Sequence, residues 1–224
     1  MPDRLAVFDL DGTLVDTAPD LSDTTNFVLA GEGLSPISPD ILRNFIGMGA
    51  RAMIEKALEK HGVARTPAEV DALRDVFTDH YATRIARHSR AFPEMLAALD
   101  ALAAAGVAVA VCTNKREALA RQLLDELSLT DRFAAICGGD TFATTKPDPE
   151  PLFGTIARAG GEPARTVYVG DSRIDFETAR AARIPMVGVT YGYSDVPIIE
   201  LGPERLCGPG EDVAAAILEL MGTD

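Results

Sequence analysis

Short apolar runs alternate with helix-length amphipathic segments along most of the chain, and this alternation limits the fold more than any other feature. Five runs predict strands, at residues 5–10, 107–113, 134–137, 166–170 and 186–190. Most are continuously apolar, as is typical of parallel strands covered on both faces. Four segments between them predict helices, at residues 94–105, 116–127, 151–159 and 176–182. The pattern predicts an α/β fold with a doubly wound parallel sheet.

One long interval interrupts the alternation. Between Thr17 and Ser89 the sequence has helical patterns and no convincing strand, and glycines and prolines divide it into about four helices. We therefore expect an inserted α-helical cap domain at residues 17–90. The α/β catalytic core is expected to combine residues 1–16 with residues 91–224.

Composition excludes several classes of protein. The 224 residues carry a net charge of −13, which argues against a nucleic-acid partner because phosphate contacts need clustered Lys and Arg. No apolar run approaches the roughly 18 residues of a membrane span, and no signal peptide is evident. The three cysteines and three histidines lack metal-site spacing. We expect a cytoplasmic protein without a membrane partner, either a monomer or a homodimer.

Polar residues follow four of the predicted strands. They lie at Asp9–Thr13, Thr113–Lys115, Gly138–Lys146 and Gly170–Asp175. In an open parallel sheet, ligands bind beyond the carboxyl ends of the strands. These four stretches therefore predict one site at one edge of the sheet.

The same stretches contain four ordered motifs. They are DLDGT at Asp9–Thr13, VCTN at Val111–Asn114, KPDP at Lys146–Pro149 and GDSRID at Gly170–Asp175. With these motifs the sequence resembles the haloacid dehalogenase-like (HAD) phosphatase superfamily over essentially its whole length. The resemblance implies a Rossmann-like core, a helical cap, and phosphomonoester hydrolysis through a phospho-aspartyl intermediate.

The first motif would supply the two reacting carboxylates. Asp9 is the expected nucleophile, because phosphoryl transfer needs little more than a positioned in-line oxygen. Asp11 is expected to protonate the leaving oxygen and later to deprotonate the hydrolytic water. Gly12 and Thr13 allow the tight turn that brings Asp9 and Asp11 to one phosphate. Thr13 is also expected to bind this phosphate.

Mg²⁺ is the expected cofactor, because hard oxygen ligands in a phosphate site suit this ion. The ligands that the resemblance implies are Asp9, the main-chain carbonyl of Asp11, Asp171 and Asp175, the last directly or through water. A spacing of four predicts that Asp171 and Asp175 lie on one helical face.

Two further motifs are expected to hold the phosphoryl group. The Thr113 hydroxyl and the Asn114 amide would bind its oxygens at the start of a helix. Lys146 would offset the charge of the neighbouring carboxylates and phosphate.

Within the superfamily, Asp11 disfavours dehalogenation, because dehalogenases lack the second aspartate of the first motif. A phosphonate hydrolase would need a Schiff-base lysine in the cap, and Lys56 and Lys60 lie in an ordinary amphipathic helix. A non-catalytic phosphate-binding regulator would have lost at least one of the core motif residues, and all are present. No P-loop string occurs.

The phosphoglycolate phosphatases resemble this chain more closely. The segment FIGMGARAMIEKAL is similar to their cap loop, in which Gly47 and Gly49 would expose backbone amides and Arg51 would contact a carboxylate. Thr145 and Arg116 depart from the subgroup, which often has arginine and proline there. The expected reaction is hydrolysis of 2-phosphoglycolate to glycolate and phosphate. The alternative is a phosphatase or mutase that acts on another small substrate, such as a sugar phosphate or pyrophosphate.

Overall fold

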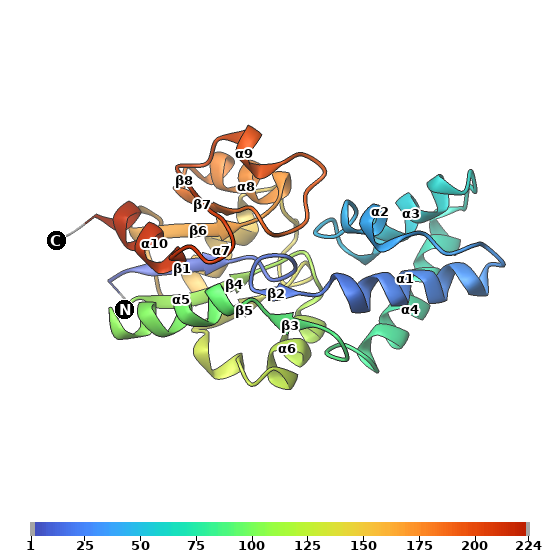
Figure 1. Cartoon of the computed structure of the whole chain (residues 1–224), viewed down its shortest axis with the longest axis horizontal. Helices are drawn as coiled ribbons and strands as arrows, with labels where there is room; N and C mark the ends of the chain where they lie inside the picture. The colour runs from blue at the N-terminus through green and yellow to red at the C-terminus, as the bar shows by residue number, and fades with distance from the viewer. Residues whose placement is uncertain (1–2, 223–224) are drawn as a thin grey trace.

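A six-stranded parallel sheet forms the centre of the molecule in the computed structural model, which describes residues 3–222 (Figure 1). Its strands, in spatial order, are β5 (Ala135–Cys137), β4 (Ala108–Cys112), β1 (Leu5–Phe8), β6 (Thr166–Gly170), β7 (Met186–Val189) and β8 (Arg205–Cys207). The chain runs outward from β1 to β5 on one side and from β6 to β8 on the other. The strand order therefore reverses next to β1, and ligands bind at such a reversal in doubly wound sheets.

The central strand is buried on both faces, as its continuous apolar sequence predicts. Val7 pairs with Ala110 of β4 and with Tyr168 of β6. Leu5 and Val7 pack into one hydrophobic cluster, whereas the alternating residues 6 and 8 pack into the other. Each face of the sheet must therefore be covered by helices.

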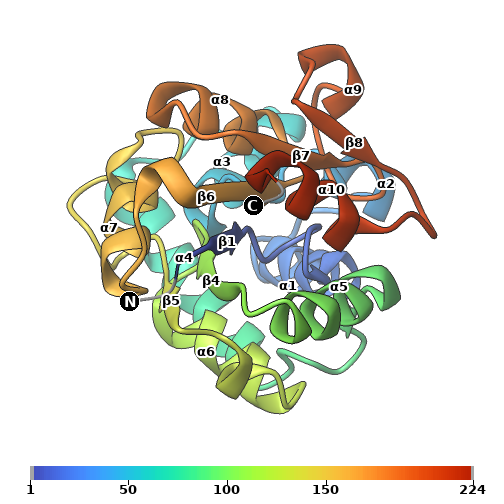
Figure 2. The same cartoon turned by 90° about the vertical axis from the view of Figure 1, so that its left-hand side faces the viewer.

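Helices cover both faces (Figure 2). On one side lie α5 (Pro93–Ala104), α6 (Glu117–Glu126) and α10 (Val213–Met221). On the other lie α7 (Glu150–Arg158), α8 (Arg173–Ala182) and the short α9 (Ile198–Leu201). Single 3₁₀ turns occur at Thr130–Arg132 and Pro163–Arg165. The expected α/β architecture is confirmed.

Four helices form a block at one end of the molecule, beyond the carboxyl ends of the strands (Figure 1). They are α1 (Ala18–Gly31), α2 (Pro39–Arg43), α3 (Ala50–Lys60) and α4 (Pro67–Ala82). Helix α1 packs against the other three. We refer to this block as the cap. Helix α4 begins with a capping box, in which Thr66 and Glu69 satisfy each other's backbone N–H groups.

The two crossings between core and cap lie side by side. They are the two-residue strands β2 (Val15–Asp16) and β3 (Arg90–Ala91), which pair antiparallel with Val15 opposite Ala91. These two strands were not predicted from the sequence, because two residues are too few to show a period. They lie at the proposed domain boundaries; the division into two domains remains our interpretation.

The segment after β7 contains three elements that the sequence analysis did not assign, namely α9, β8 and α10. β8 has only three residues and its first is exposed, so it carries no apolar run. Helix α10 had a readable signal, because Asp212 caps it and Val213, Ala214 and Ile217 form its buried stripe. Among residues 3–222, no helix combines the length and apolar character needed to cross a membrane.

Candidate active site

The ends of three neighbouring strands bring the candidate residues together. Asp9 follows β1 directly, Thr113 follows β4, and Asp171 follows β6. All three are at least nine-tenths buried. The backbone N–H of Asp9 donates to the carbonyl of Val169 at 2.9 Å, which extends the β1–β6 ladder to the residue that carries the carboxylate.

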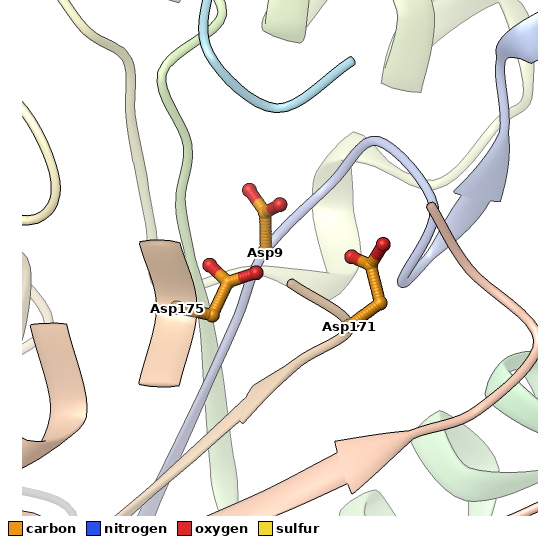
Figure 3. A group of neighbouring side chains, drawn as sticks. All are labelled: Asp9, Asp171 and Asp175. Atoms are coloured by element: carbon orange, nitrogen blue, oxygen red, sulfur yellow. The ribbon is translucent and has the colours of Figure 1, made fainter. Parts of the chain in front are cut away.

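Three carboxylates gather at this edge. Oxygens of Asp9, Asp171 and Asp175 lie within 4.8 Å of one another, and the side chains converge from the β1 loop, the end of β6 and α8 (Figure 3). Each residue is at most 3% exposed. Oδ1 of Asp9 is buried and lies 2.9 Å from Nζ of Lys146. Buried carboxylates at this separation repel one another unless a cation is shared among them.

The cluster is strained electrostatically. Burial raises the pKa of Asp9 to about 7, because the opposing attraction of Lys146 does not offset desolvation and the charge of Asp175. Burial, with the charges of Asp175 and Asp9, raises the pKa of Asp171 well above its ordinary value. A bound cation would favour the ionised form of these carboxylates.

Lys146 is the cation at the base of the cluster. Its Nζ lies 2.7 Å from Oδ1 of Asp175 and 2.9 Å from Oδ1 of Asp9. It also donates to the Tyr168 hydroxyl at 2.9 Å. Burial opposes the charge of Lys146, but Asp175 and Asp9 outweigh it and raise its pKa. One ammonium among three carboxylates leaves a net negative charge, so a divalent cation fits the residues present.

Asp175 differs from its predicted setting. The prediction that Asp171 and Asp175 share a helical face is wrong, because α8 begins at Arg173 and Ser172 is its N-cap. Asp175 is the third helical residue and forms a capping box with Ser172. Its oxygens accept from Lys146, from Tyr168 at 2.8 Å and from the Ser172 hydroxyl at 2.6 Å. Although burial opposes it, the attraction of Lys146 holds the pKa of Asp175 below its ordinary value.

Asp171 is enclosed by a tight cradle. Its oxygens accept from the Thr13 hydroxyl at 2.7 Å and from the backbone N–H of Tyr193 at 2.6 Å. Gly12 has φ +85°, and a Cβ there would lie 2.6 Å from Oδ2 of Asp171. A Cβ on Gly192 would lie 2.3 Å from the same carboxylate. Both positions therefore require glycine for close approach to Asp171.

Asp11 lies outside this cluster. Its carboxylate contacts Nζ of Lys115, 2.9 Å from Oδ1 and 3.0 Å from Oδ2, and accepts from the Thr17 hydroxyl at 2.7 Å. The sequence analysis did not single out Lys115 or Tyr193. Lys115 had a signal, since it directly follows Thr113 and Asn114 at a strand end. Tyr193 had none beyond its place after a strand.

The Thr113–Asn114 pair also differs from expectation. Helix α6 begins at Glu117, so no helix N-terminus lies directly behind Thr113. The Asn114 side chain is engaged elsewhere. It donates to the carbonyls of Gly47 and Lys146, both at 3.1 Å, and accepts from the Lys146 N–H at 3.0 Å. Asn114 therefore ties the Lys146 loop to the cap in this structure.

A cavity of about 500 Å³ lies between cap and core. It is lined by the loop and first turn of α3, by α4, by Thr113–Arg116 and by Asp11. Gly47 and Gly49 line it, with φ near +89° and +88°. Arg51 lines it too, but its guanidinium already pairs with Glu55 at 3.1 Å and Asp71 at 2.5 Å.

Comparison with known proteins agrees with this geometry. The family model described as haloacid dehalogenase-like hydrolase matches residues 6–189. The chain is similar to a phosphoglycolate phosphatase of Agrobacterium fabrum, with 48% identity over 96% of this chain and 92% of the relative. It is also similar to one of Mesorhizobium japonicum, with 46% identity over 90% of this chain and 89% of the relative.

Solved structures show the same architecture. A crystal structure described as a predicted phosphoglycolate phosphatase from Haemophilus somnus aligns with a TM-score of 0.83 and 30% identity, covering 92% of this chain and 94% of that one. The family match spans most of the chain and includes all four motifs. The chain therefore belongs to the haloacid dehalogenase-like hydrolase family.

Proposed function

We propose that the chain is a Mg²⁺-dependent phosphomonoester hydrolase that acts on 2-phosphoglycolate through a phospho-aspartyl intermediate. The observation that carries the proposal is the buried cluster of three carboxylates around Lys146 at the end of β1. The printed names of the similar proteins support the substrate. A non-catalytic regulator would have lost at least one of Asp9, Asp11, Lys146 and Asp171, and the sequence contains all four.

Asp9 and Asp171 are the proposed side-chain ligands of Mg²⁺, together with the main-chain carbonyl of Asp11 that the family resemblance implies. When bound, the ion would offset negative charge on the carboxylates and on the transferred phosphoryl group. Asp175 fits a supporting role better than a direct one, because each of its oxygens accepts two hydrogen bonds, whereas each oxygen of Asp171 accepts one. Its contact with Lys146 holds that ammonium against Asp9.

The reacting groups are proposed as follows. The Asp9 carboxylate attacks phosphorus, the ester P–O bond breaks, and Asp11 donates a proton to the leaving oxygen. Asp11 then takes a proton from water as that water attacks the acyl phosphate and releases Asp9. Lys146 and the Thr113 hydroxyl hold the phosphoryl oxygens. We revise the role of Asn114 to positioning the Lys146 loop.

The test is a panel of phosphate esters assayed with the purified protein in Mg²⁺. We expect the highest kcat/KM for 2-phosphoglycolate and lower values for sugar phosphates and pyrophosphate. The 500 Å³ cavity leaves room for a larger ester, so a preference for a sugar phosphate would replace the proposed substrate while keeping the chemistry.

The chemistry itself is tested by Asp9→Asn and by chelation. The amide cannot form the acyl phosphate, so we expect turnover to fall by several orders of magnitude, on the order of 10⁴-fold or more. EDTA should abolish turnover and added Mg²⁺ should restore it. Near wild-type hydrolysis by Asp9→Asn would exclude the nucleophile, and activity that survives thorough chelation would exclude the metal role.

A further inference from the structure

Lys115 is a buried cation on the wall of the cavity between cap and core. Its side chain is 5% exposed, and its Nζ lies 2.9 Å from Oδ1 of Asp11. The same Nζ lies 4.7 Å from the centre of the Tyr81 ring, which comes from cap helix α4. Lys115 therefore stands where the core, the cap and a reacting carboxylate meet.

The other cations that line the cavity differ from Lys115 in exposure, because their side chains are 33% to 53% exposed and pair with exposed acids. Arg51 contacts Glu55 and Asp71, Arg74 contacts Asp71 and Asp75, and Arg116 contacts Asp140. Within residues 3–222 the only carboxylate that pairs with Lys115 is Asp11. The charge of Lys115 is thus the one buried cation of the cavity wall in that part of the chain.

Two hydroxyl groups on α4 line the same cavity without an acceptor. Tyr81 is fully buried, and within residues 3–222 neither its hydroxyl nor the buried Thr78 hydroxyl donates a hydrogen bond. A spacing of three places both side chains on one face of the helix. Burial raises the pKa of Tyr81 to about 12, so its hydroxyl remains a donor at neutral pH. Buried donors that lack an acceptor and line a cavity indicate that a polar ligand accepts hydrogen bonds from them.

The first turn of α3 opens onto the same space. Ala50, Arg51 and Ala52 line the cavity, and the helix N-terminus carries a partial positive charge from its free N–H groups. An ammonium, two hydroxyl donors and a helix N-terminus converge on one region. This combination favours a bound anion over a neutral hydroxyl group.

We propose that Lys115, with the Tyr81 and Thr78 hydroxyls, binds the carboxylate of the substrate and sets the specificity for short phosphorylated carboxylic acids. The inference rests on the proposed function, since it places the phosphoryl group at Asp9. Because Lys115 touches Asp11, an anion bound to Lys115 lies next to the group assigned to the leaving oxygen. Only one or two carbons can then separate the carboxylate from the ester oxygen.

The test compares two substrates that differ only at that end. 2-Phosphoglycolate carries a carboxylate, whereas 2-hydroxyethyl phosphate carries a neutral hydroxymethyl group in its place. The discrimination ratio is kcat/KM for the first divided by kcat/KM for the second. Any general damage to Asp11 affects both substrates and cancels in the ratio.

Lys115→Met should lower the discrimination ratio on the order of 100-fold, because a desolvated charge pair is lost from one substrate only. Tyr81→Phe removes one oxygen without changing the ring, and should lower the ratio about tenfold. This second variant keeps the test open if Lys115→Met does not fold. Lys56→Met is the matched control, since Lys56 is an exposed cap lysine paired with Glu59, and should leave the ratio unchanged.

Binding gives a readout independent of turnover. In the Asp9→Asn background with Mg²⁺, calorimetry should show that Lys115→Met weakens 2-phosphoglycolate binding and leaves inorganic phosphate binding within about twofold.

The outcomes separate the two proposals. Wild-type protein that hydrolyses neither ester would overturn the proposed function. Hydrolysis of both esters with an unchanged ratio in Lys115→Met and Tyr81→Phe would overturn the carboxylate site alone. If the discrimination ratio falls in Arg51→Met and not in Lys115→Met, Arg51 binds the substrate carboxylate and the assignment of Lys115 is wrong.

Discussion

At the level of single residues, ionisation of the buried carboxyl groups is unfavourable, and a bound cation would make it less so. Asp9 and Asp171 both have raised pKa values, and burial is the main cause for each. A carboxyl group with a raised pKa in the folded protein keeps its proton over a pH range in which the unfolded chain has released it. Folding therefore competes with ionisation in this range.

The metal-free protein should lose stability as the pH rises. The pKa of Asp9 lies near 7 in the fold, against 3.8 ordinarily, so the folded state binds more protons between these values. The contribution of Asp9 to the free energy of unfolding should then fall across this interval and level off above about pH 7. Mg²⁺ should reverse the trend, because it binds the ionised carboxylates. Thermal unfolding in EDTA, at pH values from about 4 to 8, measures this.

Asp9→Asn serves as the control for that series. The amide does not titrate, so the decline with pH should be shallower in this variant by the contribution of Asp9. The lowered pKa of Asp175 acts in the opposite direction, and it is common to both proteins. Parallel curves for wild type and Asp9→Asn would contradict the assignment of a raised pKa to Asp9.

The residues that meet at the site were largely predictable because strand ends in a parallel sheet converge. Asp9, Lys146, Asp171 and Asp175 come together as the motifs predict. Their detailed partners were not predictable. The orientation of the Asp175 side chain, toward a metal site or toward Lys146, depends on the residue at which α8 begins. A shift of this helix start by one or two residues would change it.

At the level of elements, one residue, Tyr193, joins the cluster of carboxylates to the base of the cap. The backbone N–H of Tyr193 donates to Asp171, its hydroxyl donates to Asp16 in β2, and the same oxygen accepts from the N–H of Ala18 at 3.1 Å. The Arg43 guanidinium of the cap lies 5.3 Å from the ring centre. Tyr193 thus spans the loop after β7, the first cap crossing and α2.

Tyr193→Phe should loosen the cap while leaving the Asp171 contact intact. The variant keeps the ring and the backbone N–H, and loses only the hydrogen bonds with Asp16 in β2 and Ala18 in α1. We expect KM for the substrate to rise about tenfold with a smaller change in kcat, since roughly 1–2 kcal/mol of cap positioning is lost. Amide exchange at residues 16–20 should accelerate, and unchanged exchange there would contradict this role.

Sequence patterns recovered the strands whose residues are mostly apolar. The five predicted strands correspond to β1, β4, β5, β6 and β7, and their ends differ by at most two residues. The missed strands β2, β3 and β8 have two or three residues and are held by pairing with a neighbour. Such elements are specified by tertiary contacts rather than by their own composition.

At the level of the whole molecule, the charge distribution opposes the expected substrate. The net charge is −13, and the helical insert is nearly neutral, so the acidic excess belongs to the core. An anionic ester approaches against this field until it reaches the cations of the site. Mobile ions screen the long-range repulsion more strongly than the buried contacts.

Added salt should therefore raise kcat/KM for 2-phosphoglycolate. At saturating Mg²⁺ we expect a two- to threefold increase, as an order of magnitude, between about 20 mM and 150 mM ionic strength, with kcat unchanged. A less charged ester such as p-nitrophenyl phosphate should respond less. A decrease with salt would show instead that local cations, and not the acidic core, control association.

The paired strands β2 and β3 have a consequence for how such a molecule can change over time. Because Val15 lies opposite Ala91, the inserted segment between them begins and ends at adjacent points of the core. The entropic cost of closing such a segment grows only slowly with its length, by roughly 0.6 kcal/mol of free energy for each doubling. Lids of very different size can thus be grafted onto one scaffold, and substrate choice can diversify while the chemical centre stays fixed.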